Sequence, residues 1–177
     1  YFRGIRNPVG IKIGTDTDSS HLSSLLDKLN PDNDNGRIVL ITRFGAGKVE
    51  DHLPRLINIV KKLGAPVTWI IDPMHGNTEK TSNGYKTRNF DNISQEIIHS
   101  IRIHQENNSY LGGVHLELSG DDVTECIGGA AGLSESGLSR AYKTQVDPRL
   151  NYEQSLEIAM MIANQYQFMR RNDGVQS

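Results

Sequence analysis

Four short apolar segments, rich in β-branched residues, recur along the 177-residue chain. Their apolar character is nearly continuous instead of alternating with polar positions, which is typical of strands in a parallel sheet covered on both faces. The pattern therefore predicts four parallel strands. These strands are expected at residues 9–14, 37–43, 66–72 and 112–118.

A helical pattern follows each predicted strand. Apolar residues recur at the spacing of an amphipathic helix, and Gly64 stands where the second helix should end. A strand followed by a helix, four times over, is the pattern of an α/β fold with right-handed crossovers. The helices are expected at residues 19–29, 49–63, 92–105 and 152–169.

Polar side chains gather where the predicted strands end, and these are Lys12, Arg43, Asp72, His75 and Glu117. Both (β/α)8 barrels and open sheets carry their sites at that end, so position alone leaves both architectures open. A complete barrel needs about 200 residues or more. Four strand–helix units therefore indicate either a small open sheet or half of a barrel. No GxGxxG or GxxxxGK[ST] loop follows the first strand, which weakens the case for a nucleotide-binding open sheet.

Composition narrows the class of partner. The formal net charge of −2 does not favour nucleic acid or an anionic membrane as a partner. No apolar run approaches the roughly 20 residues that span a bilayer. The single cysteine, Cys126, excludes an internal disulfide and fits a reducing cytoplasm. The chain begins at Tyr1 without a methionine, from which we expect a processed or truncated chain.

Three segments carry side chains that could bind a metal ion. His75 lies in VTWIIDPMHGNT, Glu117 in GGVHLELSGDDVTEC and Asp147 in DPRLN. One histidine and two carboxylates form a mixed nitrogen and oxygen ligand set, which suits manganese, iron, cobalt or zinc better than calcium or magnesium. Lys12 and Arg43 could hold an anion beside this metal, since arginine offers a planar fork to a carboxylate or phosphate. The set predicts chemistry on a phosphorylated or carboxylated small molecule.

Each acidic candidate also has an ordinary structural interpretation. Glu117, at a strand end, needs a cation as its partner, and either a metal ion or a basic side chain would serve. Asp147 could cap the final helix, although Asn151 fits that position better. Both carboxylates therefore remain candidates for a ligand and for a structural role.

For each histidine a metal-ligand role is likewise weighed against a structural one, because a lone histidine is more often a surface or core residue than a ligand. His75 follows WII in a polar turn, where its ring can point into the mouth of a sheet or barrel. Asp72 could orient His75 or a bound water. His115 alternates with Glu117 along the predicted last strand, so both should face the same side, and a supporting role is expected for it.

The segments NPVGIKIG, RIVLITRFG, DPMHGNT, GYKTRNFD, GGVHLELSGDDVTEC and DPRLNYEQSLE resemble the C-terminal half of class II 3-deoxy-D-arabino-heptulosonate 7-phosphate (DAHP) synthases. Their spacing is consistent from about Arg6 to the last helix. The family folds as a (β/α)8 barrel and condenses phosphoenolpyruvate with erythrose 4-phosphate, the first step of the shikimate pathway. The resemblance implies strands five to eight with their helices, a single partial domain over residues 1–177, and a missing N-terminal half.

The resemblance also assigns roles to residues. His75, Glu117 and Asp147 resemble three metal ligands of the family, with manganese as the first expectation and cobalt, iron or zinc as alternatives. Lys12 and Arg43 resemble contacts to phosphoenolpyruvate, and Lys86 and Arg88 match a segment that lines the same mouth. The residues expected to be catalytic are Lys12, Arg43 and His75. The family's fourth ligand, a cysteine of the first barrel strand, lies upstream of the matching region, and Cys126 matches a different family cysteine.

Two further interpretations stay open. The chain could belong to another metal-dependent, aldolase-like barrel enzyme. It could also be a catalytically incomplete half-barrel or an assembly partner. A half-barrel has two strand edges that template pairing with another chain, so self-association as a homo-oligomer, or packing against the missing half, is expected.

Overall fold

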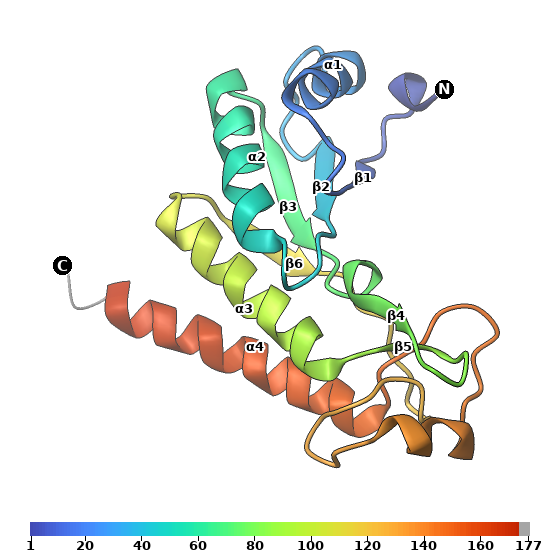
Figure 1. Ribbon diagram of the computed structural model, residues 1–177. Coiled ribbons are helices and arrows are strands. Elements are labelled where there is room, and N and C mark those ends of the chain that lie inside the picture. The colour runs from blue at the N-terminus through green and yellow to red at the C-terminus, as the bar shows by residue number, and fades with distance from the viewer. Residues whose placement is uncertain (174–177) are drawn as a thin grey trace.

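The computed structural model describes residues 1–173, so residues 174–177 of the predicted domain lie outside the described residues (Figure 1). One sheet holds four parallel strands in the order β1-β2-β3-β6. The strands are β1 (Val9–Ile13), β2 (Ile38–Thr42), β3 (Val67–Ile71) and β6 (Leu111–Val114). The helices are α1 (Ser19–Leu29), α2 (Val49–Leu63), α3 (Phe90–Glu106) and α4 (Tyr152–Asp173). The alternation of strands and helices that the hydrophobic pattern predicts is confirmed.

The helices cover one face of this sheet. On β2, Ile38, Leu40 and Thr42 are buried against the helices, whereas Val39 and Ile41 are only partly buried. Helices adjacent in the chain pack against each other, and Figure 1 shows α2, α3 and α4 side by side. The strand order follows the chain without the reversal that marks a doubly wound open sheet. This mixed α/β arrangement is consistent with part of a (β/α) barrel, and the expected cover on both faces is not found within residues 1–173.

The last predicted strand is too long. β6 ends at Val114, and the segment after it turns to pair with the chain before α4, where the Leu150 amide donates to the Glu117 carbonyl at 3.0 Å. The prediction that His115 and Glu117 alternate along one strand is therefore wrong. His115 is exposed, and its side chain makes no hydrogen bond among the described residues. No contact therefore supports the expected role of His115 in orienting a metal ligand.

A small hairpin was not predicted. β4 (Thr78–Lys80) and β5 (Lys86–Arg88) pair in antiparallel fashion across a turn that contains Gly84. The strands are only three residues long, too short for an alternating pattern to reveal them. The hairpin matters because it brings Lys86 and Arg88 to the edge of the main sheet. Three short 3-10 helices, at Phe2–Gly4, His75–Asn77 and Glu135–Arg140, complete the elements.

Capping side chains and a glycine bound the helices, and the ends expected at Gly64 and Asn151 are confirmed. The Asp18 carboxylate accepts from the His21 amide at 2.7 Å at the start of α1, and Gly64 ends α2 in the left-handed region. Asn151 caps α4, because its Oδ1 accepts from the Gln154 backbone amide at 2.9 Å. In return the Asn151 backbone amide donates to Gln154 Oε1 at 3.2 Å. Asp147 is therefore not needed as the cap. None of the helices described combines the length and apolar character that crossing a membrane requires.

Two loops at the carboxyl edge touch backbone to backbone at Gly45 and Gly76. A Cβ atom on Gly76 would lie 2.3 Å from the Gly45 nitrogen and 2.8 Å from the Phe44 carbonyl carbon. Gly76→Ala should therefore lower the free energy of unfolding by about 3 kcal/mol, because the backbone of the facing loop cannot yield as a side chain does. Denaturant unfolding measures this.

Gly120→Ala is the matched control for that substitution, since a Cβ there meets nothing within 4 Å. It should change the unfolding free energy by less than about 0.5 kcal/mol. Equal effects of the two substitutions would contradict the close approach of the loops.

Candidate metal centre

Three side chains from separate loops converge at the carboxyl edge of the sheet. His75 follows β3, Glu117 follows β6 and Asp147 precedes α4, and one potential ligand atom from each lies within 4.8 Å of the others. His75 Nε2 is 3.5 Å from Glu117 Oε1 and 3.7 Å from Asp147 Oδ2. Each side chain is about a quarter exposed, at 23%, 27% and 23% respectively, so an ion could reach them from solvent.

Asp72 orients the imidazole of His75. Its fully buried carboxylate lies 2.7 Å from His75 Nδ1 and also accepts from the backbone amides of Met74 and His75. Burial alone would raise the pKa of Asp72, but hydrogen bonds from Lys12 and His75 bring it below its ordinary value. An anionic Asp72 favours the tautomer with hydrogen on Nδ1 and leaves Nε2 as an acceptor toward the centre. Of the two roles considered for Asp72, the geometry supports the orientation of His75.

Arg88 anchors the two acidic side chains from behind. Its guanidinium is fully buried, and Nη1 donates both to Glu117 Oε2 and to the Pro148 carbonyl. Its Nε donates to Thr78 Oγ1 at 3.0 Å, and Nη2 lies 3.8 Å from Asp147 Oδ1. One oxygen of each carboxylate is therefore held by a cation, which leaves Glu117 Oε1 and Asp147 Oδ2 facing His75.

Lys86 adds a second cation to Asp147. Its ammonium group donates to Asp147 Oδ1, and the lysine side chain is 48% exposed. This hydrogen bond is the main cause that lowers the pKa of Asp147 below its ordinary value. Unlike Arg88, Lys86 is exposed enough to exchange its protein partner for an anionic ligand.

The loop that carries Asp147 is fastened by a buried carboxylate, Glu125. It accepts from the backbone amides of Lys143, Thr144 and Arg149, and it also pairs with the Arg149 guanidinium at 2.8 Å. Burial opposes ionisation, yet these bonds bring the pKa of Glu125 below its ordinary value. Sequence reasoning missed this residue, because the motif containing Glu125 gives no sign that its side chain turns toward a loop about twenty residues later.

The two cations predicted from strand ends occupy the same edge. Lys12 Nζ lies 2.6 Å from Asp72 Oδ2 and 3.4 Å from His75 Nδ1, so a protein carboxylate is its partner here. Arg43 directly follows β2, which lies between β1, the strand that contains Lys12, and β3, the strand that Asp72 follows. Its side chain is exposed and makes no hydrogen bond or ion pair with any side chain that the structure describes. Lys12 and Arg43 together form a cationic rim at the same edge of the sheet as the cluster of His75, Glu117 and Asp147.

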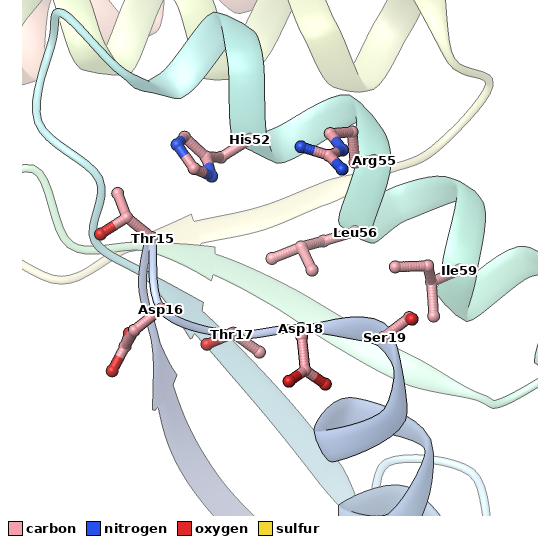
Figure 2. A pocket seen from close by; sticks show the side chains of 9 residues that line it. All are labelled: Thr15, Asp16, Thr17, Asp18, Ser19, His52, Arg55, Leu56 and Ile59. Atoms are coloured by element: carbon pink, nitrogen blue, oxygen red, sulfur yellow. The ribbon is translucent and has the colours of Figure 1, made fainter.

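Two other features contribute no side chain to this cluster. Cys126 is fully buried, and burial raises the pKa of its thiol to about 12, which keeps it neutral. A cleft of about 310 Å³ separates the loop before α1 from the side of α2, with His52 and Arg55 on one wall and Asp16 and Asp18 on the other (Figure 2). None of the residues lining the cleft belongs to the metal-competent cluster.

Comparisons with known proteins agree with one another. Residues 1–163 match the model of the Class-II DAHP synthetase family. Proteins named phospho-2-dehydro-3-deoxyheptonate aldolase are 51% identical over 97% of the chain in Neurospora crassa and 44% identical over 92% in Streptomyces coelicolor. The Mycolicibacterium smegmatis protein of that name is 45% identical over 90% of the chain. The chain spans only about a third of the length of these curated relatives, at 36%, 36% and 34%.

Proposed function

Because the chain belongs to the class-II DAHP synthetase family, we propose that it carries part of the site that condenses phosphoenolpyruvate with erythrose 4-phosphate. The products are DAHP and phosphate, and the reaction opens the shikimate pathway to aromatic amino acids. The observation that carries the proposal is the convergence of His75, Glu117 and Asp147 beside a cationic rim.

The donor set fits a divalent metal. His75 Nε2, Glu117 Oε1 and Asp147 Oδ2 face a common point, while the outer atom of each side chain is held by Asp72, Arg88 or Lys86. Such outer partners fix ligand orientation, as they do in known metal sites. Manganese is our first candidate, with cobalt, iron or zinc as alternatives. When bound, the metal supplies Lewis-acid polarisation of the aldehyde oxygen of erythrose 4-phosphate.

The cationic rim would hold the anionic donor substrate. Arg43 offers a planar fork for the carboxylate or phosphate of phosphoenolpyruvate, and Lys12 adds a point charge next to His75. Lys86 is placed to contact a substrate anion at the same mouth. Arg88 is fully buried and bonded to protein oxygens, so we assign it the positioning of Glu117 and Asp147 instead of the substrate contact expected from the resemblance.

We propose that the four strand–helix units are strands five to eight, closed by an N-terminal half that belongs to the longer protein. Supporting this, the chain matches about a third of its relatives' length, and the sheet described here ends at β1 and β6. Unpaired edges of this kind template pairing with another segment.

Removal of metal tests the function directly. Treating the full-length protein with EDTA should abolish DAHP formation from phosphoenolpyruvate and erythrose 4-phosphate. Manganese added back should restore it better than calcium does, because nitrogen and oxygen ligands together favour transition metals. Verified metal-free protein that still forms DAHP would refute the metal-dependent mechanism. Reaction with another keto or enol donor, and none with phosphoenolpyruvate, would indicate a different aldolase-like activity.

A further inference from the structure

One buried carboxylate lies near the proposed centre but belongs to no part of it. Glu96 of α3 has no exposed surface, and its two oxygens accept from the Phe44 amide at 2.9 Å and from Asn77 Nδ2 at 2.7 Å. Burial raises the pKa of Glu96 to about 7, although every one of these partners is a donor and opposes that rise. Burying a carboxylate costs free energy, so a role of Glu96 is expected in the contacts that it makes.

Asn77 links Glu96 to the loops after β2 and β3. Its side-chain oxygen accepts from the Ala46 amide at 3.0 Å, and its Nδ2 donates to the Pro73 carbonyl at 2.8 Å as well as to Glu96. These bonds fix which end of the amide faces each partner. Glu96 and Asn77 thus tie the loop after β2 to the loop after β3, where the backbones of Gly45 and Gly76 already touch.

Each of the two joined loops carries one part of the proposed site. Arg43 immediately precedes the amide held by Glu96, and His75 lies two residues before Asn77. His75 has a second anchor of its own in Asp72, whereas the Arg43 side chain makes no hydrogen bond within the part of the chain described. The Arg43 amide donates to the Ile13 carbonyl at 3.0 Å, so it is the loop just after Arg43, from Phe44 to Ala46, that depends on Glu96 and Asn77.

Building on the proposed function, we propose that Glu96 and Asn77 are positioning residues that set the spacing between the anion-binding Arg43 and the metal ligand His75. They touch neither substrate nor metal. Their loss should release the loop just after Arg43 and weaken phosphoenolpyruvate binding, while the metal site stays intact. This pattern separates a positioning role from a merely structural one.

Glu96→Gln in the full-length protein tests this. Glutamine keeps the shape of glutamate, but its NH₂ group replaces one of the two accepting oxygens and so faces the Phe44 amide or Asn77 Nδ2, both of which are donors. We expect the KM for phosphoenolpyruvate to rise about tenfold and the Kd for Mn²⁺ to change less than about threefold. Hydrogen exchange at the Phe44 and Ala46 amides should quicken about tenfold. Glu106→Gln, on the same helix with a side chain 62% exposed, is the matched control and should change none of the three.

Several outcomes would overturn the proposal. Folded Glu96→Gln protein with unchanged exchange and unchanged KM would do so, as would a lowered Tm with kinetics of the folded fraction unaltered. If that variant fails to fold, Asn77→Ala removes the link to Ala46 without burying a new polar group, and the same readouts decide. Wild-type protein that forms no DAHP would sink the proposed function alone, since exchange at Phe44 and Ala46 and calorimetric binding of phosphoenolpyruvate still judge the positioning role.

Discussion

His75→Ala in the full-length protein should lower divalent-metal affinity by about 100-fold or more and abolish DAHP formation with it. The reason is geometric, because His75 Nε2 is the only nitrogen facing Glu117 Oε1 and Asp147 Oδ2 in the described cluster. Two partly exposed carboxylates alone would bind a hydrated ion weakly and with little selectivity. Calorimetric titration of metal-free protein with Mn²⁺ measures the loss.

The fold should survive that substitution. His75 is partly exposed, and Asp72 keeps its bonds to Lys12 and to the Met74 amide, so the unfolding free energy should stay within about 1 kcal/mol of wild type. His21→Ala, at an exposed position on α1, is the control for loss of an imidazole and should bind metal normally. Full metal stoichiometry and affinity in His75→Ala would refute the proposed centre.

Arg88→Met should lower the unfolding free energy of the metal-free protein by about 3 kcal/mol or more. Arg88 is fully buried between Glu117 and Asp147, and without its charge these two carboxylates would repel each other. Glu117 Oε2 would lose its donor, and Asp147 Oδ1 would keep Lys86 as its cation. The Pro148 carbonyl and Thr78 Oγ1 would also lose their donor. Chemical denaturation with and without Mn²⁺ measures the effect.

Bound Mn²⁺ should stabilise the Arg88→Met variant more than the wild type, because the cation relieves the same repulsion. Arg102→Met is the matched control, since Arg102 is half exposed and pairs with Glu50 on the surface, where removal should cost less than about 1 kcal/mol. A stable Arg88→Met protein that loses only affinity for substrate would show that Arg88 contacts substrate after all.

The hydrophobic pattern predicted the order of elements well and their ends less well. The bounds of α1 and α2 match, because Asp18 and Gly64 are local capping signals. The last strand ends four residues early, at Val114, because its continuation pairs with the chain before α4, a contact between distant segments. The hairpin that delivers Lys86 and Arg88 also lacked a local signal of sufficient length.

For the candidate site, the sequence predicted the potential ligands but not the side chains that hold them in place. Residue types marked His75, Glu117 and Asp147 as possible ligands, and the structure brings one potential ligand atom of each within 4.8 Å of the others. Sequence reasoning missed the buried acids Glu96 and Glu125, because nothing in a helix or loop pattern shows that a carboxylate turns inward to meet backbone amides.

By itself the sequence determined the alternation of strands and helices and the chemical nature of the side chains at the strand ends, because hydrophobic period and donor type are properties of neighbouring residues. Only the tertiary structure decided which oxygen of each carboxylate faces His75, that Arg88 is buried behind them, and that Glu96 joins two loops. Those arrangements depend on bonds between residues far apart in the chain, whose free energy exists only once the sheet and its helices have assembled.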